Sequence, residues 1–459
     1  MSETIAAIAT GLSQSGISII RISGSEAISI GDKIFRTKTK DHILLDAESH
    51  TIHYGFIYDG KELIDEVMVS VMKSPRSYTM EDVVEINCHG GILLTNHILE
   101  LVLKNGARLA DPGEFTKRAF LNGRIDLSKA EAVMDVITSE NEIALKTSVR
   151  QLRGSVFHII KNLREKIIYE IAYIESALDD PEHINIEGYG KKLLSVLEEL
   201  VFDIKKLLDN ADDGKVIKEG IKTVIVGKPN AGKSSLLNLL VGEEKAIVTD
   251  VAGTTRDALE QFIKIKGIGL HVIDTAGIRK TEDIVEKIGV EKALQFTEEA
   301  DLILYVVDAS VPLDENDFEI FSLIEQKNKI ILLNKTDLVS VVTEEMIKEK
   351  YSGNCSVIKV CATEGEGIEE LQNEVQKMFF DGKIYSDNEI YITNVRHKEA
   401  IRKAYESLLL VKDSVSLGMS EDFYSIDLMD AYTALGTVIG EEVGEDLVDE
   451  IFSKFCMGK

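Results

Sequence analysis

The sequence contains few of the residues that would indicate a secreted, fibrous or membrane-spanning protein. Four cysteines in 459 residues are too few for a disulfide framework and are typical of a reducing cytosol. Five prolines beside 33 glycines exclude a collagen-like or low-complexity chain. No run reaches the ~20 apolar residues of a membrane span, and the N-terminus has neither a basic start nor a long apolar run. We therefore expect a cytoplasmic protein with no membrane segment.

Positive charge is scarce as well. Lys and Arg number 52 against 79 Asp and Glu, which gives a net charge of −27. Because a protein that coats nucleic acid needs a local excess of positive charge, this composition excludes a simple RNA-coating protein. One stretch, 146–166, leans basic, and we expect a solvated helix face that allows at most a modest contact with RNA. Its basic residues are Lys146, Arg150, Arg153, Lys161, Arg164 and Lys166.

The length predicts two to four domains, and the texture of the chain changes along it. Short β-rich runs alternate with turns at the start, long segments with apolar residues at helical spacing follow, and short apolar runs typical of buried parallel strands come next. Asp212-Asp213-Gly214 indicates a boundary before that third region. The sequence thus predicts a multidomain α/β protein with an α+β domain over 1–120, a discontinuous helical domain over 121–215 and 381–459, and an inserted α/β domain over 216–380.

A phosphate-binding loop opens the inserted domain. The predicted strand 221–226 runs into Gly227-Lys-Pro-Asn-Ala-Gly-Lys-Ser234, a complete G-x-x-x-x-G-K-S pattern. Glycines let backbone N–H groups curl around phosphates, and the helix that follows presents its positive end. Lys233 would reach the β- and γ-phosphates, and Ser234 would bind Mg²⁺. The expected phosphate contacts are Asn230, Ala231, Gly232, Lys233, Ser234 and Ser235.

Three further motifs follow in the order expected of a GTPase. Asp274 to Gly277 places a carboxylate near the metal and a glycine N–H near the γ-phosphate. Asn334-Lys-Thr-Asp337 supplies a carboxylate that pairs with the N1–H and 2-amino donors of guanine, which adenine lacks. Cys361 to Thr363 is the second expected base contact. The sequence therefore predicts GTP binding, with further contacts from Asp274, Thr275, Ala276, Gly277, Asn334, Lys335, Asp337, Cys361, Ala362 and Thr363.

The group that orients the attacking water is not evident from these motifs. Ile278 follows Gly277, whereas many related proteins carry a glutamine near this point, so the candidates are Glu282, Asp283 and Glu286. A switch segment before the second motif supplies hydroxyl and carbonyl groups, and Thr255 is its natural Mg²⁺ ligand. Arg256 fits a switch role better than that of an arginine finger. The expected nucleotide contacts of this segment are Thr249, Asp250, Val251, Ala252, Gly253, Thr254 and Thr255.

Five blocks of sequence together resemble the MnmE (TrmE) family of tRNA-modification GTPases. They are the phosphate loop with Asn230, Ser77–Gly91, Pro112–Arg124, the switch Ala246–Asp257 and the final Phe-Cys-Met-Gly-Lys. The GTPase motifs alone would leave Era-like and Der-like relatives open, but the N-terminal blocks and the tail do not. The resemblance implies a Ras-like GTPase domain and an N-terminal folate-binding and dimerisation domain.

The resemblance also implies a potassium-dependent GTPase whose GTPase domains pair across the nucleotide. K⁺ would be held by Asn230, Thr249, Val251 and Thr254, and Glu286 would orient the water. The expected contacts to 5-formyltetrahydrofolate or 5,10-methylenetetrahydrofolate are Arg21, Glu85, Arg124 and Lys459. Cys456 is either a chemically active thiol or a small residue that docks the tail, and both interpretations stay open.

By the same resemblance, a homodimer of the chain would work with MnmG (GidA), an FAD-dependent subunit, in a heterotetramer that acts on tRNA. The pair would add an aminomethyl or carboxymethylaminomethyl group to C5 of the wobble uridine, using a tetrahydrofolate one-carbon unit. The alternative is an Era- or Der-like regulatory switch that binds RNA or the ribosome without modifying it. A third possibility is a nucleotide-gated scaffold that only holds the flavoprotein.

Overall fold

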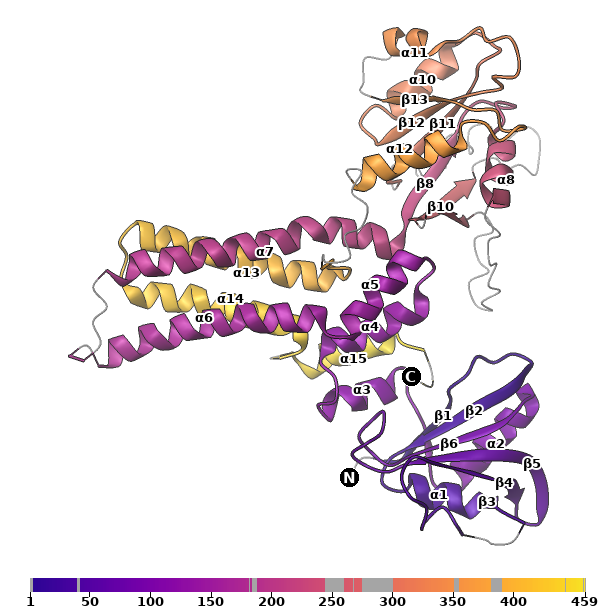
Figure 1. Ribbon diagram of the computed structural model, residues 1–459, viewed down its shortest axis with the longest axis vertical. Helices are drawn as coiled ribbons and strands as arrows, with labels where there is room; N and C mark the ends of the chain where they lie inside the picture. Colours follow the sequence, from indigo (N-terminus) through magenta and orange to yellow (C-terminus); the bar gives the residue numbers. More distant parts are fainter. Residues whose placement is uncertain are drawn as a thin grey trace. The chain divides into compact units, whose positions relative to one another are not determined.

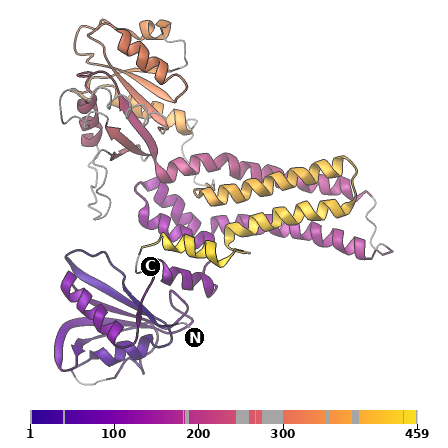
Figure 2. The same cartoon turned by 180° about the vertical axis from the view of Figure 1, so that it is seen from behind.

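The computed structural model describes residues 3–38, 42–180, 182–183, 188–243, 260–266, 268–274, 300–350, 355–380, 390–441, 443–456 and 458. Its packing divides the chain into two compact units (Figures 1 and 2). The first unit comprises Met1–Ile137, Val149–Leu200 and Lys403–Lys459, and the second comprises Thr138–Ser148 and Val201–Arg402. Among the described residues, the helices are all too short or too polar to cross a bilayer.

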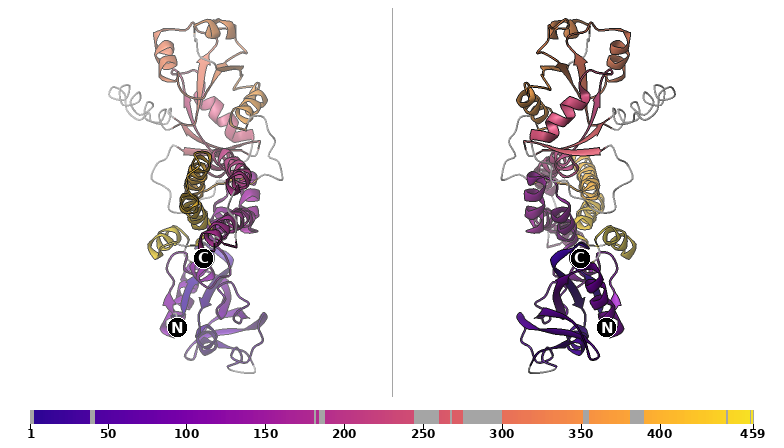
Figure 3. Two further views of the ribbon diagram at one scale, coloured as in Figure 1. Left: turned by 90° about the vertical axis from the view of Figure 1, so that its left-hand side faces the viewer. Right: turned by 90° about the vertical axis from the view of Figure 1, so that its right-hand side faces the viewer.

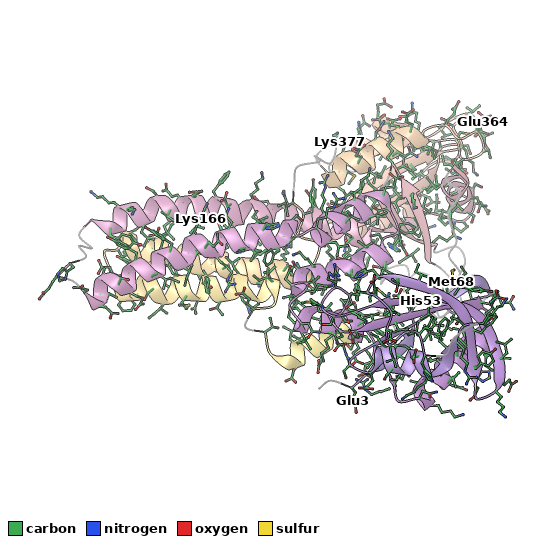
Figure 4. The ribbon with its side chains drawn as sticks, turned by 60° about the horizontal axis from the view of Figure 1, so that its bottom comes forward. Glu3, His53, Met68, Lys166, Glu364 and Lys377 are labelled. Carbon is green, nitrogen blue, oxygen red and sulfur yellow. The ribbon has the colours of Figure 1, made fainter. Side chains whose placement is uncertain are left out.

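The first unit begins with a mixed sheet of seven strands. Neighbouring strands are antiparallel except β1 and β7, which run parallel. Alternate residues of the strands form an apolar core with helices α1 (Ala27–Ile34) and α2 (Ile92–Lys104), which therefore cover one face of the sheet. His53 and Met68, labelled in Figure 4, lie on two neighbouring strands. In spatial order the strands are β3 (Phe35–Arg36), β4 (Thr51–Asp59), β5 (Glu62–Met72), β6 (Val83–Gly90), β2 (Ser15–Ser23), β1 (Ile5–Ile8) and β7 (Arg108–Leu109).

Helices follow the sheet and return at the end of the chain, as the sequence predicts. Of the apolar residues at helical spacing in this region, Leu152 ends α5 and is 36% exposed, and Ile159 is half-buried. The others are buried along the long helix α6, at Val156, Ile160, Leu163, Ile167, Ile171 and Ile174. The helices are α3 (Glu114–Leu121), α4 (Leu127–Thr138), α5 (Glu142–Leu152), α6 (Ser155–Asp179), α7 (Tyr189–Glu219), α13 (Val395–Ser416), α14 (Glu421–Ile439) and α15 (Glu445–Ser453).

The basic stretch 146–166 is not a uniformly solvated face. Arg164 is 5% exposed, its guanidinium stacks on the ring of Tyr432 at 3.9 Å, and it forms an ion pair with Glu441. It therefore packs α6 against α14, which lie side by side (Figure 1). Lys166, labelled in Figure 4, pairs with Glu199. Part of the positive charge that the sequence offers to RNA is thus neutralised within the fold.

The second unit is built on a sheet of six described strands, of which β9 alone runs antiparallel to its neighbour. Figure 3 gives two further views of this unit. Helices α8 (Lys233–Glu243) and α12 (Ile368–Phe380) pack on one face, since their apolar residues share one core. Helices α10 (Glu315–Leu323) and α11 (Glu344–Lys350) pack on the other face. The spatial order is β13 (Ser356–Lys359), β12 (Lys329–Asn334), β11 (Leu302–Asp308), β8 (Ile221–Val226), β10 (Ile268–Asp274) and β9 (Glu260–Ile265).

Asp212–Gly214, where the sequence predicts a domain boundary, lies inside α7, which continues to Glu219 just before β8. A Cβ atom on Gly214 would lie 2.3 Å from the carbonyl oxygen of Ile392, so the glycine permits close packing rather than a turn. Residues at the start of α5 also pack against the second unit. Asn141 donates to the carbonyl of Ile217 at 3.1 Å, and Ala144 belongs to the apolar core of the sheet.

Candidate functional sites

The phosphate loop follows β8 at the carboxyl end of the parallel strands. Gly227 and Gly232 have φ angles of 150° and 99°, which side chains rarely adopt. A Cβ atom on Gly227 would lie 2.4 Å from the carbonyl oxygen of Val306, and one on Gly232 would lie 2.0 Å from Nδ2 of Asn334. Asn230 is left-handed as well, at φ 62°. Backbone conformation and close packing therefore both require the two glycines of the motif.

Lys233 and the two serines stand where the loop enters α8. The Nζ atom of Lys233 donates to the carbonyl oxygens of Gly227 and Lys228, both at 2.7 Å. Ser234 and Ser235 are exposed in the first turn of α8, where backbone N–H groups have no helical partner and attract anions. The Ser234 hydroxyl suits Mg²⁺, which prefers oxygen ligands.

Asn334 joins the phosphate loop to the base loop. Its side chain is 2% exposed and uses both ends: Nδ2 donates to the carbonyl of Ala231 at 2.8 Å, and Oδ1 accepts from the N–H of Ala362 at 3.1 Å. The structure thus brings the Asn334–Asp337 and Cys361–Thr363 motifs together beside the phosphate loop, as the sequence predicts. Glu364, labelled in Figure 4, lies in the turn that follows them.

Asp337, the carboxylate predicted to read guanine, is exposed at this edge. Cys361, which is buried, lies with its Sγ 3.4 Å from Oδ1 of Asp337 and donates to it. Lys335 is tied back to the end of β11, with its Nζ 2.6 Å from the Asp308 carboxylate. Burial alone would raise the pKa of Asp308, but the bonds from Lys335 and Ser310 hold it below its ordinary value. The exposed Asp337 thus accepts from Cys361, and its pairing with the two guanine donors stays a prediction.

The other nucleotide contacts cannot be placed in this way. Asp274 ends β10 beside β8, so its backbone is at the same edge of the sheet. Thr249–Thr255, Thr275–Gly277 and Glu286 lie outside the described residues. The second Mg²⁺ ligand, three of the four K⁺ ligands and the water-orienting group stay predictions.

A second group of predicted site residues meets in the first unit. Arg21 of β2 and Glu85 of β6 stand opposite each other in the antiparallel register. Because Ile20 and Ile22 belong to the core under α1 and α2, Arg21 and Glu85 project from the other face of the sheet. Nε of Arg21 donates to Oε1 of Glu85 at 2.8 Å.

An aromatic ring that the sequence did not single out organises this group. The guanidinium of Arg124 lies 4.5 Å from the ring centre of Tyr78, and that of Arg21 lies 5.4 Å from it. The Tyr78 hydroxyl shares a 2.9 Å hydrogen bond with Thr116 of α3. The only signal in the sequence was its place in the block Ser77–Gly91, so its contacts with two distant arginines could not be predicted.

The C-terminal tail reaches the same place. Phe452 and Phe455 pack with Leu127 and other residues of α4, and the Cys456 carbonyl accepts from the N–H of Gly113 at 3.4 Å. The Gly458 carbonyl then accepts from Arg21 at 3.4 Å. Cys456 itself is exposed. Lys459 is outside the described residues.

A charge cluster around the buried Glu114 and Arg118 packs next to this group. Arg108 binds both oxygens of Glu114, at 2.7 and 2.9 Å, and Arg118 donates to Glu114 at 2.9 Å and to Glu81 at 3.0 Å. Burial raises the pKa of Glu114, but its bonds with Arg108, with the N–H of Asp111 and with Arg118 lower it to about 2. The cluster fixes α3, and so Thr116, against the loop that carries Tyr78.

The sheet order of the second unit, its phosphate loop and its Asn-Lys-x-Asp motif define a Ras-like P-loop GTPase domain. Two family models together match most of the chain: the "GTP-binding protein TrmE N-terminus" matches residues 4–124, and the "MnmE helical domain" matches residues 127–456. The chain belongs to the MnmE (TrmE) family, and the fold class predicted from the sequence is confirmed.

The chain is also similar to curated proteins over its whole length. The chain is 57% identical over 458 residues to "tRNA modification GTPase MnmE" of Lachnoclostridium phytofermentans, covering 100% of both chains. It is 49% identical over 463 residues to the protein of the same name from Clostridioides difficile, again covering 100% of both. Among solved structures, Aquifex aeolicus Era bound to GDP and aluminium fluoride is 29% identical, covers 41% of this chain and 67% of its own, and has a TM-score of 0.29.

Proposed function

We propose that the chain is a cytoplasmic, potassium-dependent GTPase that modifies tRNA. With MnmG (GidA), an FAD-dependent partner, it would add an aminomethyl or carboxymethylaminomethyl group to C5 of the wobble uridine. A tetrahydrofolate derivative would supply the carbon, and GTP hydrolysis would drive pairing and release of the GTPase domains. The observation that carries this proposal is full-length similarity to proteins named tRNA modification GTPase MnmE.

The N-terminal cluster supports the folate part of the proposal. A pterin ring offers an amino group and an adjacent ring N–H that a carboxylate such as Glu85 can pair with at two points. Arg21 and Arg124 would then meet the pterin carbonyl or the glutamate tail. In the described residues Glu85 already has Arg21 as a partner at 2.8 Å, so its charge is balanced before a ligand arrives.

An apolar patch supports the homodimer. Ile52, Tyr54 and Met68 are 68%, 54% and 47% exposed. Tyr54 and Met68 stand opposite each other in the register of β4 and β5, and Ile52 shares their face by the period of two. Such patches on soluble proteins mark contact surfaces, and a second copy of the domain would cover this one.

K⁺ would sit where other GTPases place an arginine finger, neutralising charge between the β- and γ-phosphates. Asn230, exposed in the left-handed turn of the phosphate loop, would be its side-chain ligand. Thr249, Val251 and Thr254 would complete the set, and Ser234 with Thr255 would hold Mg²⁺. Glu286 would orient the attacking water.

The deciding experiment is a titration of the full chain with 5-formyltetrahydrofolate, followed by calorimetry. We expect saturable binding that Glu85→Gln weakens at least tenfold, because the amide loses one acceptor and the charge. Glu66→Gln, on the exposed neighbouring strand, is the matched control and should bind like the wild type. A full chain that does not bind the folate would contradict the folate proposal.

The alternative, an Era- or Der-like switch that binds RNA or the ribosome without modifying it, is not favoured, because the family match includes the N-terminal domain over residues 4–124. A direct test is nucleoside analysis of tRNA from a strain lacking the protein. Loss of the modified wobble uridine is expected, and unchanged wobble nucleosides would return the switch alternative.

A further inference from the structure

The second residue of the phosphate loop makes a contact that neither the motif nor the hydrolysis explains. Lys228 does not point to where phosphates bind. Its Nζ atom lies 2.7 Å from Oδ2 of Asp317 and 3.0 Å from Oδ2 of Asp314. Both carboxylates begin helix α10, on the face of the sheet opposite α8. Lys228 therefore ties the loop to an element beyond the nucleotide site.

The receiving end of this tether is rigid. Asp314 and Asp317 cap α10 reciprocally: Asp314 accepts from the N–H of Asp317, and Asp317 accepts from the N–H of Asp314 at 2.9 Å. The Asp317 side chain is 1% exposed, and its other oxygen, Oδ1, accepts from the hydroxyl of the fully buried Tyr305 at 2.6 Å. The burial of Tyr305 and its bond to Asp317 raise the pKa of its hydroxyl, so it stays a donor at neutral pH.

The other end of the tether leads to the motif lysine. The Lys228 carbonyl is one of the two oxygens that hold Lys233 at 2.7 Å. The side chain of Lys228 thus fixes the peptide group that holds the ammonium group of Lys233, the expected partner of the β- and γ-phosphates. Asn230 lies two residues further along the same anchored backbone.

We propose that Lys228 is a positioning residue of the GTPase, which through Asp314 and Asp317 holds the phosphate loop in the form that receives the nucleotide. The anchor acts before chemistry and equally on GDP and GTP. Without this anchor the loop is ordered only when the nucleotide binds, and the free energy of that ordering lowers the nucleotide affinity. The rate of the chemical step does not change. The buried Asp317 is the stronger partner, and the half-exposed Asp314 adds less.

The test measures GDP affinity, the KM and kcat for GTP, and the melting temperature of the full chain. For Lys228→Met we expect GDP affinity to fall and KM to rise about tenfold, with kcat within twofold. Lys228→Arg, which keeps the charge, should recover most of the loss. Tyr305→Phe is the matched control, because it removes the hydrogen bond to Oδ1 of Asp317 and leaves the contact between Lys228 and Oδ2 of Asp317 in place. It should lower the melting temperature and change GDP affinity less than twofold.

Lys228→Met leaves Asp317 buried without its cation and can therefore fail to fold. The double variant Lys228→Met with Asp317→Asn removes both charges and should show the same tenfold loss in a folded protein. Wild-type affinity in either variant would overturn the proposal. So would an affinity loss in Tyr305→Phe that matches that of Lys228→Met, since a purely structural role would then suffice.

Discussion

Glu114→Gln tests the buried cluster that supports the N-terminal site. The carboxylate accepts from Arg108 at 2.7 and 2.9 Å, from Arg118 at 2.9 Å and from the N–H of Asp111 at 2.9 Å. Its pKa falls from an ordinary 4.5 to about 2. That difference corresponds to roughly 3 kcal/mol of stability from the ionised form. We expect the amide to lose about 2–3 kcal/mol at pH 7, since it keeps one acceptor but not the charge.

The sign of the pH dependence follows from the direction of the change. A pKa lowered by folding adds stability above pH 4.5, and this stability is lost as the pH falls towards 2. The gap between wild type and Glu114→Gln should therefore narrow over that window. Hydrogen exchange of the α3 amides, followed by mass spectrometry at several pH values, measures the gap locally.

Asp111→Asn is the matched control. Its carboxylate is 82% exposed and stands 3.8 Å from Arg108, so removing it should cost less than ~1 kcal/mol. The reasoning fails if Asp111→Asn costs as much as Glu114→Gln. It fails equally if the gap between Glu114→Gln and the wild type stays constant from pH 7 to 3.

Three further predictions concern the nucleotide site. GTP turnover, measured by phosphate release, should rise many-fold when K⁺ replaces Na⁺, and equal rates would remove the potassium proposal. Asp337→Asn should shift preference from GTP towards xanthosine triphosphate, because the amide N–H₂ of Asn can donate to the carbonyl that xanthine carries in place of the guanine 2-amino donor. Competition binding measures this preference, and retained GTP preference would refute the contact. Glu286→Ala should bind GTP normally and lose turnover in single-turnover assays, whereas unchanged turnover would return the role to Glu282 or Asp283.

Local patterns were sufficient to predict the elements that build the sites. The phosphate loop and the Asn334–Asp337 motif depend on residues close in sequence, and each follows a strand that the apolar runs identify. The strand predicted at 221–226 has the bounds of the observed β8, Ile221–Val226.

Contacts between distant residues could not be predicted. Nothing local to Lys228 indicates Asp317, which lies 89 positions later, and nothing local to Tyr78 indicates Arg124. The continuation of α7 through Gly214 could not be predicted either, because a glycine costs about 1 kcal/mol inside a helix, and its reason, the close approach of Ile392, is a distant contact.

The two hydrogen bonds of the Asn334 side chain couple the binding of the two ends of a nucleotide. One buried amide holds the phosphate loop through Ala231 and the base loop through Ala362, so ordering either loop orders the other. If bound guanosine raises the affinity for pyrophosphate by some factor, bound pyrophosphate must raise the affinity for guanosine by the same factor. The two fragments, added separately, should bind cooperatively, and the affinity of GDP should exceed what its halves predict one at a time.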